Sequence, residues 1–100
     1  MSQVAVIQQG PVLAMSSREI AALVESRHDN VKRTIERLGE KGVIRFTPSE
    51  ETSHAGAGAR PVSVYLVDKR DSFVVVAQLS PEFTARLVDR WQELESQLAH

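Results

Sequence analysis

Two helix-start signals only ten residues apart constrain the fold more than any other feature of this chain. Ser16 is followed three residues later by Glu19, a capping box in which each side chain bonds a backbone N–H at a helix start. Ser26 and Asp29 repeat the same pattern. The first helix must end before the second signal, so the spacing predicts a short helix, a tight turn and a second helix.

Apolar residues at helical spacing give both helices an inner face. Ala21 is small enough for the second helix to cross the first, and Gly39 and Gly42 mark the end of the second helix. These features predict a helix-turn-helix over residues 16–41. Glu25 lies at the turn, where glycine is common because it adopts a left-handed backbone conformation without strain. With glutamate at this position, a slightly different turn is an open alternative. The inward-facing residues are Ile20, Leu23, Val24, Val31, Ile35 and Leu38.

The residues that follow predict a wing over 43–67, made of two strands and a loop. Residues 43–46 and 62–67 have the apolar or alternating character of strands. Residues 47–61 are polar, rich in glycine, alanine and serine, and without periodicity, so they are predicted to form a mobile loop. Nearer the start of the chain, residues 4–7 predict a short strand closed by a turn.

The C-terminal part, residues 70–98, is predicted to add helices. The charged residues 68–71 predict a turn, and the apolar run 73–79 is compatible with a strand or with a buried helix. The serine at 80 is followed by Pro81, which suits a helix N-cap and the first helical position.

The apolar stripe of this last helix is long for a single small domain. Phe83 and Leu87 are predicted to pack in the core. Trp91, Leu94 and Leu98 continue the stripe. They either extend the core or form a dimer contact with a second copy of the chain.

Together these elements predict an α+β fold: a winged helix-turn-helix with a small antiparallel sheet and a long C-terminal helix, in one domain over residues 1–100. Hydrophobic residues make up 42% of the chain, enough for one core. There is no cysteine, which excludes a disulfide scaffold and cysteine zinc sites and fits a reducing cytosol. Residues 1–15 carry no lysine, arginine or long apolar run, so we expect no signal peptide, no membrane span and a cytoplasmic location.

Charge is distributed unevenly along the chain. The formal net charge of −1 argues against an indiscriminate polyanion binder. Residues 16–45 carry seven basic and five acidic side chains, whereas residues 46–100 carry five basic and eight acidic ones. The positive part of the chain is therefore the part that contains the helix-turn-helix.

With Val31 and Ile35 facing inward, the outer face of helix 27–38 is predicted to enter the major groove of double-stranded DNA. Asp29 on this face either accepts a hydrogen bond from a cytosine amino group or restrains Arg33 through an i,i+4 pair. Base-edge contacts are expected from Arg27, His28, Asn30 and Arg33, phosphate contacts from Ser17, Lys32 and Arg37, and a phosphate or minor-groove contact from Arg60 in the wing loop.

No arrangement of residues indicates catalysis. The three histidines lack metal-ligand spacing, and no catalytic triad, phosphate-binding glycine loop or close carboxylate pair is evident. We therefore expect no enzyme activity, no metal and no cofactor. One module of this size buries little surface on DNA, so we expect a homodimer on two half-sites.

The chain also resembles a known family, the phage regulatory protein Rha family. The resemblance is carried by residues 17–21 (SREIA), 27–31 (RHDNV) and 65–73 (YLVDKRDSF), and by the amphipathic last helix. It covers about residues 4 to 97. It implies a winged helix-turn-helix regulator of phage or prophage origin that acts in the bacterial cytoplasm and influences lysis or lysogeny. It also favours a helix over a strand for residues 73–79.

A rival function is that of an antirepressor, which binds another phage or host regulatory protein without touching DNA. The near-neutral net charge and the acidic C-terminal half fit this alternative. Retention on heparin distinguishes the two, because a DNA binder is held and then released by salt.

Overall fold

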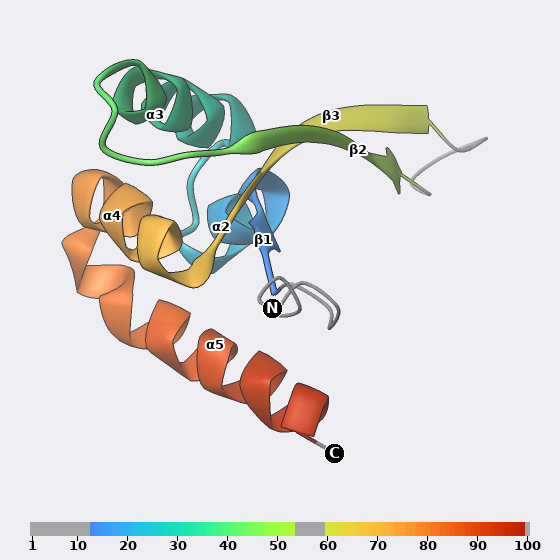
Figure 1. Ribbon diagram of the computed structural model, residues 1–100, viewed down its shortest axis with the longest axis vertical. Helices are drawn as coiled ribbons and strands as arrows, with labels where there is room; N and C mark the ends of the chain where they lie inside the picture. The colour runs from blue at the N-terminus through green and yellow to red at the C-terminus, as the bar shows by residue number, and fades with distance from the viewer. Residues whose placement is uncertain (1–12, 54–59, 100) are drawn as a thin grey trace, which may run out of the picture.

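The computed structural model describes residues 13–53 and 60–99, which form an α+β winged helix-turn-helix (Figure 1). The predicted strand at residues 4–7 lies outside the described residues. Helix α3 and the β2–β3 hairpin lie at one end of the molecule, and the long helix α5 lies at the opposite end. The elements are β1 (Met15–Ser16), α2 (Ser17–Leu23), α3 (His28–Glu40), β2 (Thr47–Ser53), β3 (Arg60–Val67), α4 (Lys69–Leu79), the 3₁₀ turn η1 (Pro81–Phe83) and α5 (Thr84–Ala99).

The helix-turn-helix is formed by α2 and α3, as predicted. Ser16 caps α2, and its side chain accepts the backbone N–H of Glu19 at 3.2 Å. The predicted second cap is wrong. The N-cap of α3 is Arg27, and no described side chain caps this helix start. Ser26 belongs to the turn instead, because its backbone N–H donates to the carbonyl of Ala21 at 3.0 Å.

The turn between α2 and α3 has the geometry that glycine would provide, although no glycine is present. Glu25 has a φ of 54°, the only positive φ of a non-glycine residue in the described part of the chain. The N–H of Ser26 bonds the carbonyl of Ala21, and the N–H of Glu25 bonds that of Ala22 at 3.4 Å, which is the Schellman pattern of a helix C-terminus. The alternative of a different turn is therefore wrong: the glutamate adopts the left-handed conformation.

The first half of the wing differs from the prediction. Residues 43–46 are not a strand but a connecting loop whose polar groups are bonded to helices. The N–H of Val43 donates to the carbonyl of Leu38 at 3.0 Å, and the N–H of Arg45 donates to the buried carboxylate of Asp71 at 3.0 Å. Ile44, between them, is buried in the core. Ile44 and Phe46 thus pack in or against the core rather than forming a strand, whereas Val43 is exposed.

The strands of the wing occupy most of the segment predicted to be a mobile loop. Strands β2 and β3 pair antiparallel from Thr47 opposite Leu66 to Ser53 opposite Arg60. Strand β1 pairs with the other side of β3, so the sheet order is β1-β3-β2. Strand β2 is an edge strand, which explains how it accommodates Pro48. The hairpin projects from the body (Figure 1), so its residues need not alternate in polarity.

Residues 73–79 lie in helix α4, as the family resemblance favoured. The side chain of Asp68 caps this helix by accepting the N–H of Asp71 at 2.8 Å, so the charged segment predicted as a turn contains the start of the helix. Helix α5 begins at Thr84, after the 3₁₀ turn that contains Pro81, slightly later than the proline signal predicted.

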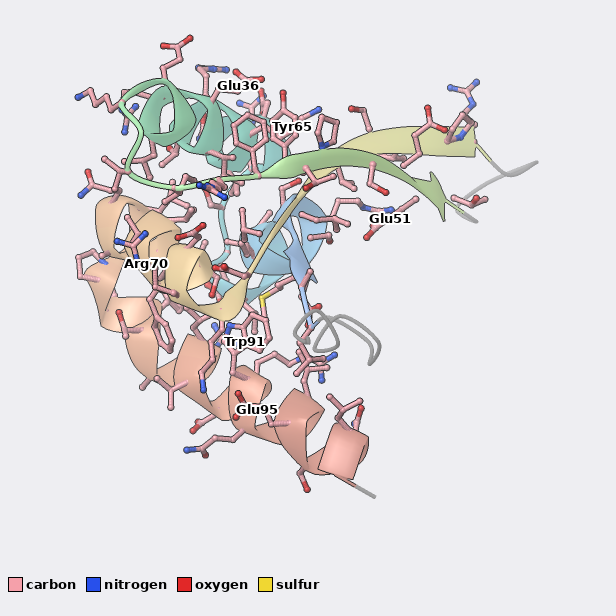
Figure 2. The ribbon with its side chains drawn as sticks, viewed as in Figure 1. Glu36, Glu51, Tyr65, Arg70, Trp91 and Glu95 are labelled. Atoms are coloured by element: carbon pink, nitrogen blue, oxygen red, sulfur yellow. The ribbon has the colours of Figure 1, made fainter. Side chains whose placement is uncertain are left out.

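Trp91 lies in the core between α5 and α4. Its side chain is 1% exposed, and the indole N–H donates to Oγ of the fully buried Ser72 at 2.8 Å. Figure 2 shows Trp91 pointing inward from α5. The proposed dimer contact through Trp91 is therefore wrong, because the residue is already covered within one chain. Leu94 packs against the core, whereas Leu98 is 49% exposed.

Candidate nucleic-acid interface

The N-terminal turns of α3 present a group of exposed charged side chains. The side chains of Arg27, Asp29 and Arg33 are 81%, 57% and 69% exposed. One carboxylate oxygen of Asp29 lies 3.6 Å from Nε of Arg27, and the other lies 3.6 Å from Nη2 of Arg33. The predicted i,i+4 contact with Arg33 is thus present, and Arg27 joins it from the other side. Asn30 and Arg37 are exposed on the same helix.

Ser17, predicted to contact phosphate, is instead a buried structural residue. Its side chain is fully buried. Its hydroxyl oxygen accepts the backbone N–H of Tyr65 at 3.0 Å and lies 2.7 Å from Nε2 of His28. One hydroxyl therefore joins α2, α3 and β3. The prediction was wrong because the sequence alone does not place β3 against the start of α2.

His28, the first residue of α3, is half-buried at this junction. Burial, together with the nearby positive charges of Lys32 and Arg18, lowers the pKa of His28 below its ordinary value of 6.5. The ring is therefore uncharged at neutral pH. Because the hydroxyl of Ser17 already accepts from Tyr65, its own hydrogen can be donated to Nε2 of the neutral ring. His28 is thus held by the fold rather than pointing freely toward a ligand.

Lys32, another predicted phosphate contact, connects α3 to the wing. Its Nζ lies 3.2 Å from the carbonyl oxygen of Ser63, 3.3 Å from the Ser63 hydroxyl and 5.0 Å from the centroid of the Tyr65 ring. The Tyr65 hydroxyl donates to the carboxylate of Glu36, and Figure 2 shows these two side chains facing each other between β3 and α3. This hydrogen bond raises the pKa of Tyr65. These contacts hold α3 against the hairpin.

A close contact between Gly39 on α3 and Phe46, which directly precedes β2, also holds the helix against the hairpin. A Cβ atom on Gly39 would come within 2.5 Å of Cε1 of Phe46, so only glycine lets the ring lie there. The ring of Phe46 packs in turn on Tyr65, with centroids 4.6 Å apart and planes tilted by 56°. The sequence indicated Gly39 only as the end of a helix. Its contact with Phe46 was missed because Phe46 lies in the segment predicted as a strand.

Further charges lie along the hairpin. Arg60 is exposed at the first position of β3, within the segment predicted as a loop. Arg18 on α2, which the sequence did not single out, lies 3.6 Å from Glu51 on β2, whose position Figure 2 marks. The charged side chains of α3 balance. They are Lys32, Arg33 and Arg37 against Asp29, Glu36 and Glu40.

Within 13–53 and 60–99, no group of three histidine or acidic side chains is placed to hold a metal ion. In that same part of the chain, no helix has the length and apolar character needed to cross a membrane.

Comparison with known proteins adds one finding. The family model described as phage regulatory protein Rha matches residues 15–96. The match covers all the described elements, except for the last residues of α5. No curated protein and no solved structure matches the chain.

Proposed function

The chain belongs to the phage regulatory protein Rha family, and we propose that it regulates transcription by binding double-stranded DNA. In this proposal α3 docks in the major groove with its N-terminal turns toward the base edges. The proposal includes a cytoplasmic location and action through binding rather than catalysis.

The observation that carries the proposal is the exposed N-terminal part of α3. Arg27, Asn30 and Arg33 are all exposed there, while Val31 and Ile35 of the same helix are fully buried. Arginine can bond guanine through two acceptors, and asparagine can do the same with adenine. A helix that is anchored on one face and carries such side chains on the other is suited to reading base edges.

The contacts between α3 and the hairpin support the same function. Base reading requires that the side chains be held in a fixed geometry by supporting contacts. Lys32 and Glu36 bond to β3, and His28 bonds to the hydroxyl of Ser17. The helix and the hairpin therefore meet a ligand as one rigid unit. Arg37 and Arg60 are placed outside these contacts, where phosphates can reach them.

We expect two copies to act together. A single module buries too little surface for useful specificity, and helix-turn-helix dimers read half-sites about 34 Å apart. With few basic groups on each copy, one copy neutralises few phosphates, so a dimer would double the electrostatic contribution.

The test is fluorescence anisotropy of labelled duplexes in a salt series. Wild-type protein should bind, and the affinity should fall steeply as salt rises, because bound phosphates release counterions. Arg33→Ala should cost about 1–3 kcal/mol of binding free energy and relax the preference at one base pair. Arg86→Ala, which removes the same charge from α5, should leave the affinity unchanged. Absence of binding to any duplex at low salt, with the protein folded, would sink the proposal.

A second candidate function is binding to another regulatory protein, as an antirepressor does. It is favoured by the acidic side chains that share the same end of the molecule as the proposed reading surface. These are Glu36 and Glu40 on α3 and Glu50 and Glu51 on β2. Two results together would establish this function instead. The folded protein would bind neither heparin nor any duplex, and it would form a complex of defined stoichiometry with a purified phage repressor.

A further inference from the structure

We propose that Asp29 is a specificity-determining residue of α3, which selects a cytosine in the major groove beside a guanine read by one of the adjacent arginines. This inference rests on the proposed DNA binding and goes beyond it, because it names a base and the side chain that reads it.

The position of Asp29 carries the argument. Its carboxylate lies between the two guanidinium groups, 3.6 Å from Arg27 and 3.6 Å from Arg33. Asp29 is also two residues from Arg27 and one helical turn from Arg33, so a base that either arginine reads lies near the carboxylate even when the ion pairs are broken. Arginine that binds guanine approaches its O6 and N7 atoms, so we expect Asp29 to meet a neighbouring base pair of the same groove.

The ion pairs themselves do not explain why the carboxylate is there. All three side chains are more than half exposed, and ion pairs in such positions are weak and screened by salt. DNA can therefore pull the arginines away at little cost. Once it does so, the carboxylate is left in a groove lined by phosphates, where it is repelled unless a hydrogen-bond donor meets it.

Only one base offers such a donor without an acceptor beside it. In the major groove guanine presents two acceptors and thymine one acceptor and a methyl group, while adenine presents an amino group next to the acceptor N7. Cytosine presents its N4 amino group alone. A carboxylate fits cytosine and is repelled, fully or in part, by the other three bases. Because the flanking arginines favour guanine, we expect the site to hold a cytosine adjoining a guanine.

A purely structural role makes a different prediction. Asp29 is in the first turn of α3, where a negative charge interacts favourably with the helix dipole. If this were its whole role, its replacement would change thermal stability but leave the base preference intact. Base preference is therefore the informative measurement.

The experiment is selection of bound duplexes from a random-sequence library by the full chain, followed by sequencing. Asp29→Asn keeps the size of the side chain but replaces the carboxylate with an amide, which pairs with adenine through N6 and N7. Glu40→Gln is the matched control. It removes one negative charge from the same outer face of α3, eleven residues or about 16 Å farther along the helix.

The wild type should select sites with cytosine beside guanine, and Asp29→Asn should replace that cytosine by adenine with the flanking bases unchanged. In direct titrations the ratio of affinities for the two sites should shift by about 5- to 150-fold in favour of adenine. Glu40→Gln should select the same sequence as the wild type. Both variants should bind random duplex more tightly than the wild type, because each removes a repelled charge.

Two results would overturn the inference. One leaves the proposed DNA binding intact, and the other rules it out as well. If the wild type and Asp29→Asn select the same sequence, Asp29 does not read a base, while DNA binding by α3 stands. If the wild type enriches no duplex and binds none in titration, the proposed function fails, and this inference fails with it.

Discussion

The hydroxyl of Ser17 accepts the backbone N–H of Tyr65 and meets the ring of His28 2.7 Å away. At the scale of single residues, this junction explains why two predicted DNA contacts have other roles. The side chains have the right chemistry for phosphate and bases, but their hydrogen-bonding groups are used inside the protein. Residue type alone indicates what a side chain can bind. It does not indicate whether contacts within the protein already use the hydrogen-bonding groups of that side chain.

The lowered pKa of His28 makes stability depend on pH. Since the folded pKa lies below the unfolded value of about 6.5, the unfolded chain binds more protons between the two values. The contribution of His28 is therefore fully present above about pH 6.5 and is lost as the pH falls toward the folded pKa. Urea unfolding at several pH values should show this loss in the wild type relative to His28→Gln, which does not titrate.

A direct NMR titration of the His28 ring provides a second measurement. It should give a pKa below 6.5. A pKa at or above 6.5, together with parallel pH profiles for the wild type and His28→Gln, would show that the junction does not favour the neutral ring.

At the scale of elements, the helices and the second strand of the wing were predictable, and the first strand of the wing was not. Helices α2 and α3 follow from local signals. Ile20 and Val24 at the first helix, and Val31 and Ile35 in the second, are each four residues apart and buried. Strand β2 gives no such signal, because it is polar and its partner β3 begins only at Arg60. The contacts that orient α3, such as Lys32 with Ser63, join residues 31 positions apart and leave no local pattern.

The turn between α2 and α3 permits a test with two substitutions at one position. Glu25→Gly and Glu25→Ala both remove the exposed ion pair with Arg86. Only glycine adopts a φ near 54° without strain, so Glu25→Gly should be more stable than Glu25→Ala by about 1 kcal/mol in the free energy of unfolding. Chemical denaturation measures the difference. Equal stabilities would indicate that the turn relaxes to another conformation when the glutamate is removed.

At the scale of the whole molecule, one end carries the proposed reading surface and the opposite end is less completely covered. Helix α5 packs Leu87 and Trp91 into the core, and the same stripe continues to Leu98 near the end of the helix. Leu98 is exposed because no described element covers it. This end of the molecule lies away from α3 and the hairpin (Figure 1), so a second copy could bind there without blocking the proposed reading surface.

We therefore expect self-association through the end of α5. Light scattering coupled to size-exclusion chromatography should show a dimer whose population rises with concentration. Leu98→Gln should shift the equilibrium toward the monomer, because it removes an exposed apolar side chain that association would bury. Substitution of the neighbouring exposed Gln97 by Ala should have little effect. A wild type that stays monomeric at every concentration would contradict this expectation.

The design of the hairpin also bears on how such a protein changes over evolutionary time. Val64 is the last fully buried residue of β3, and toward Arg60 the strand is half-buried or exposed. Mutations in that outer half meet few neighbours, so selection on stability hardly restrains them. Residues nearer the body, such as Tyr65, are bonded to α3. The outer half of β3 can therefore diversify while the inner half preserves the orientation of α3, and changes there need not cost the fold its stability.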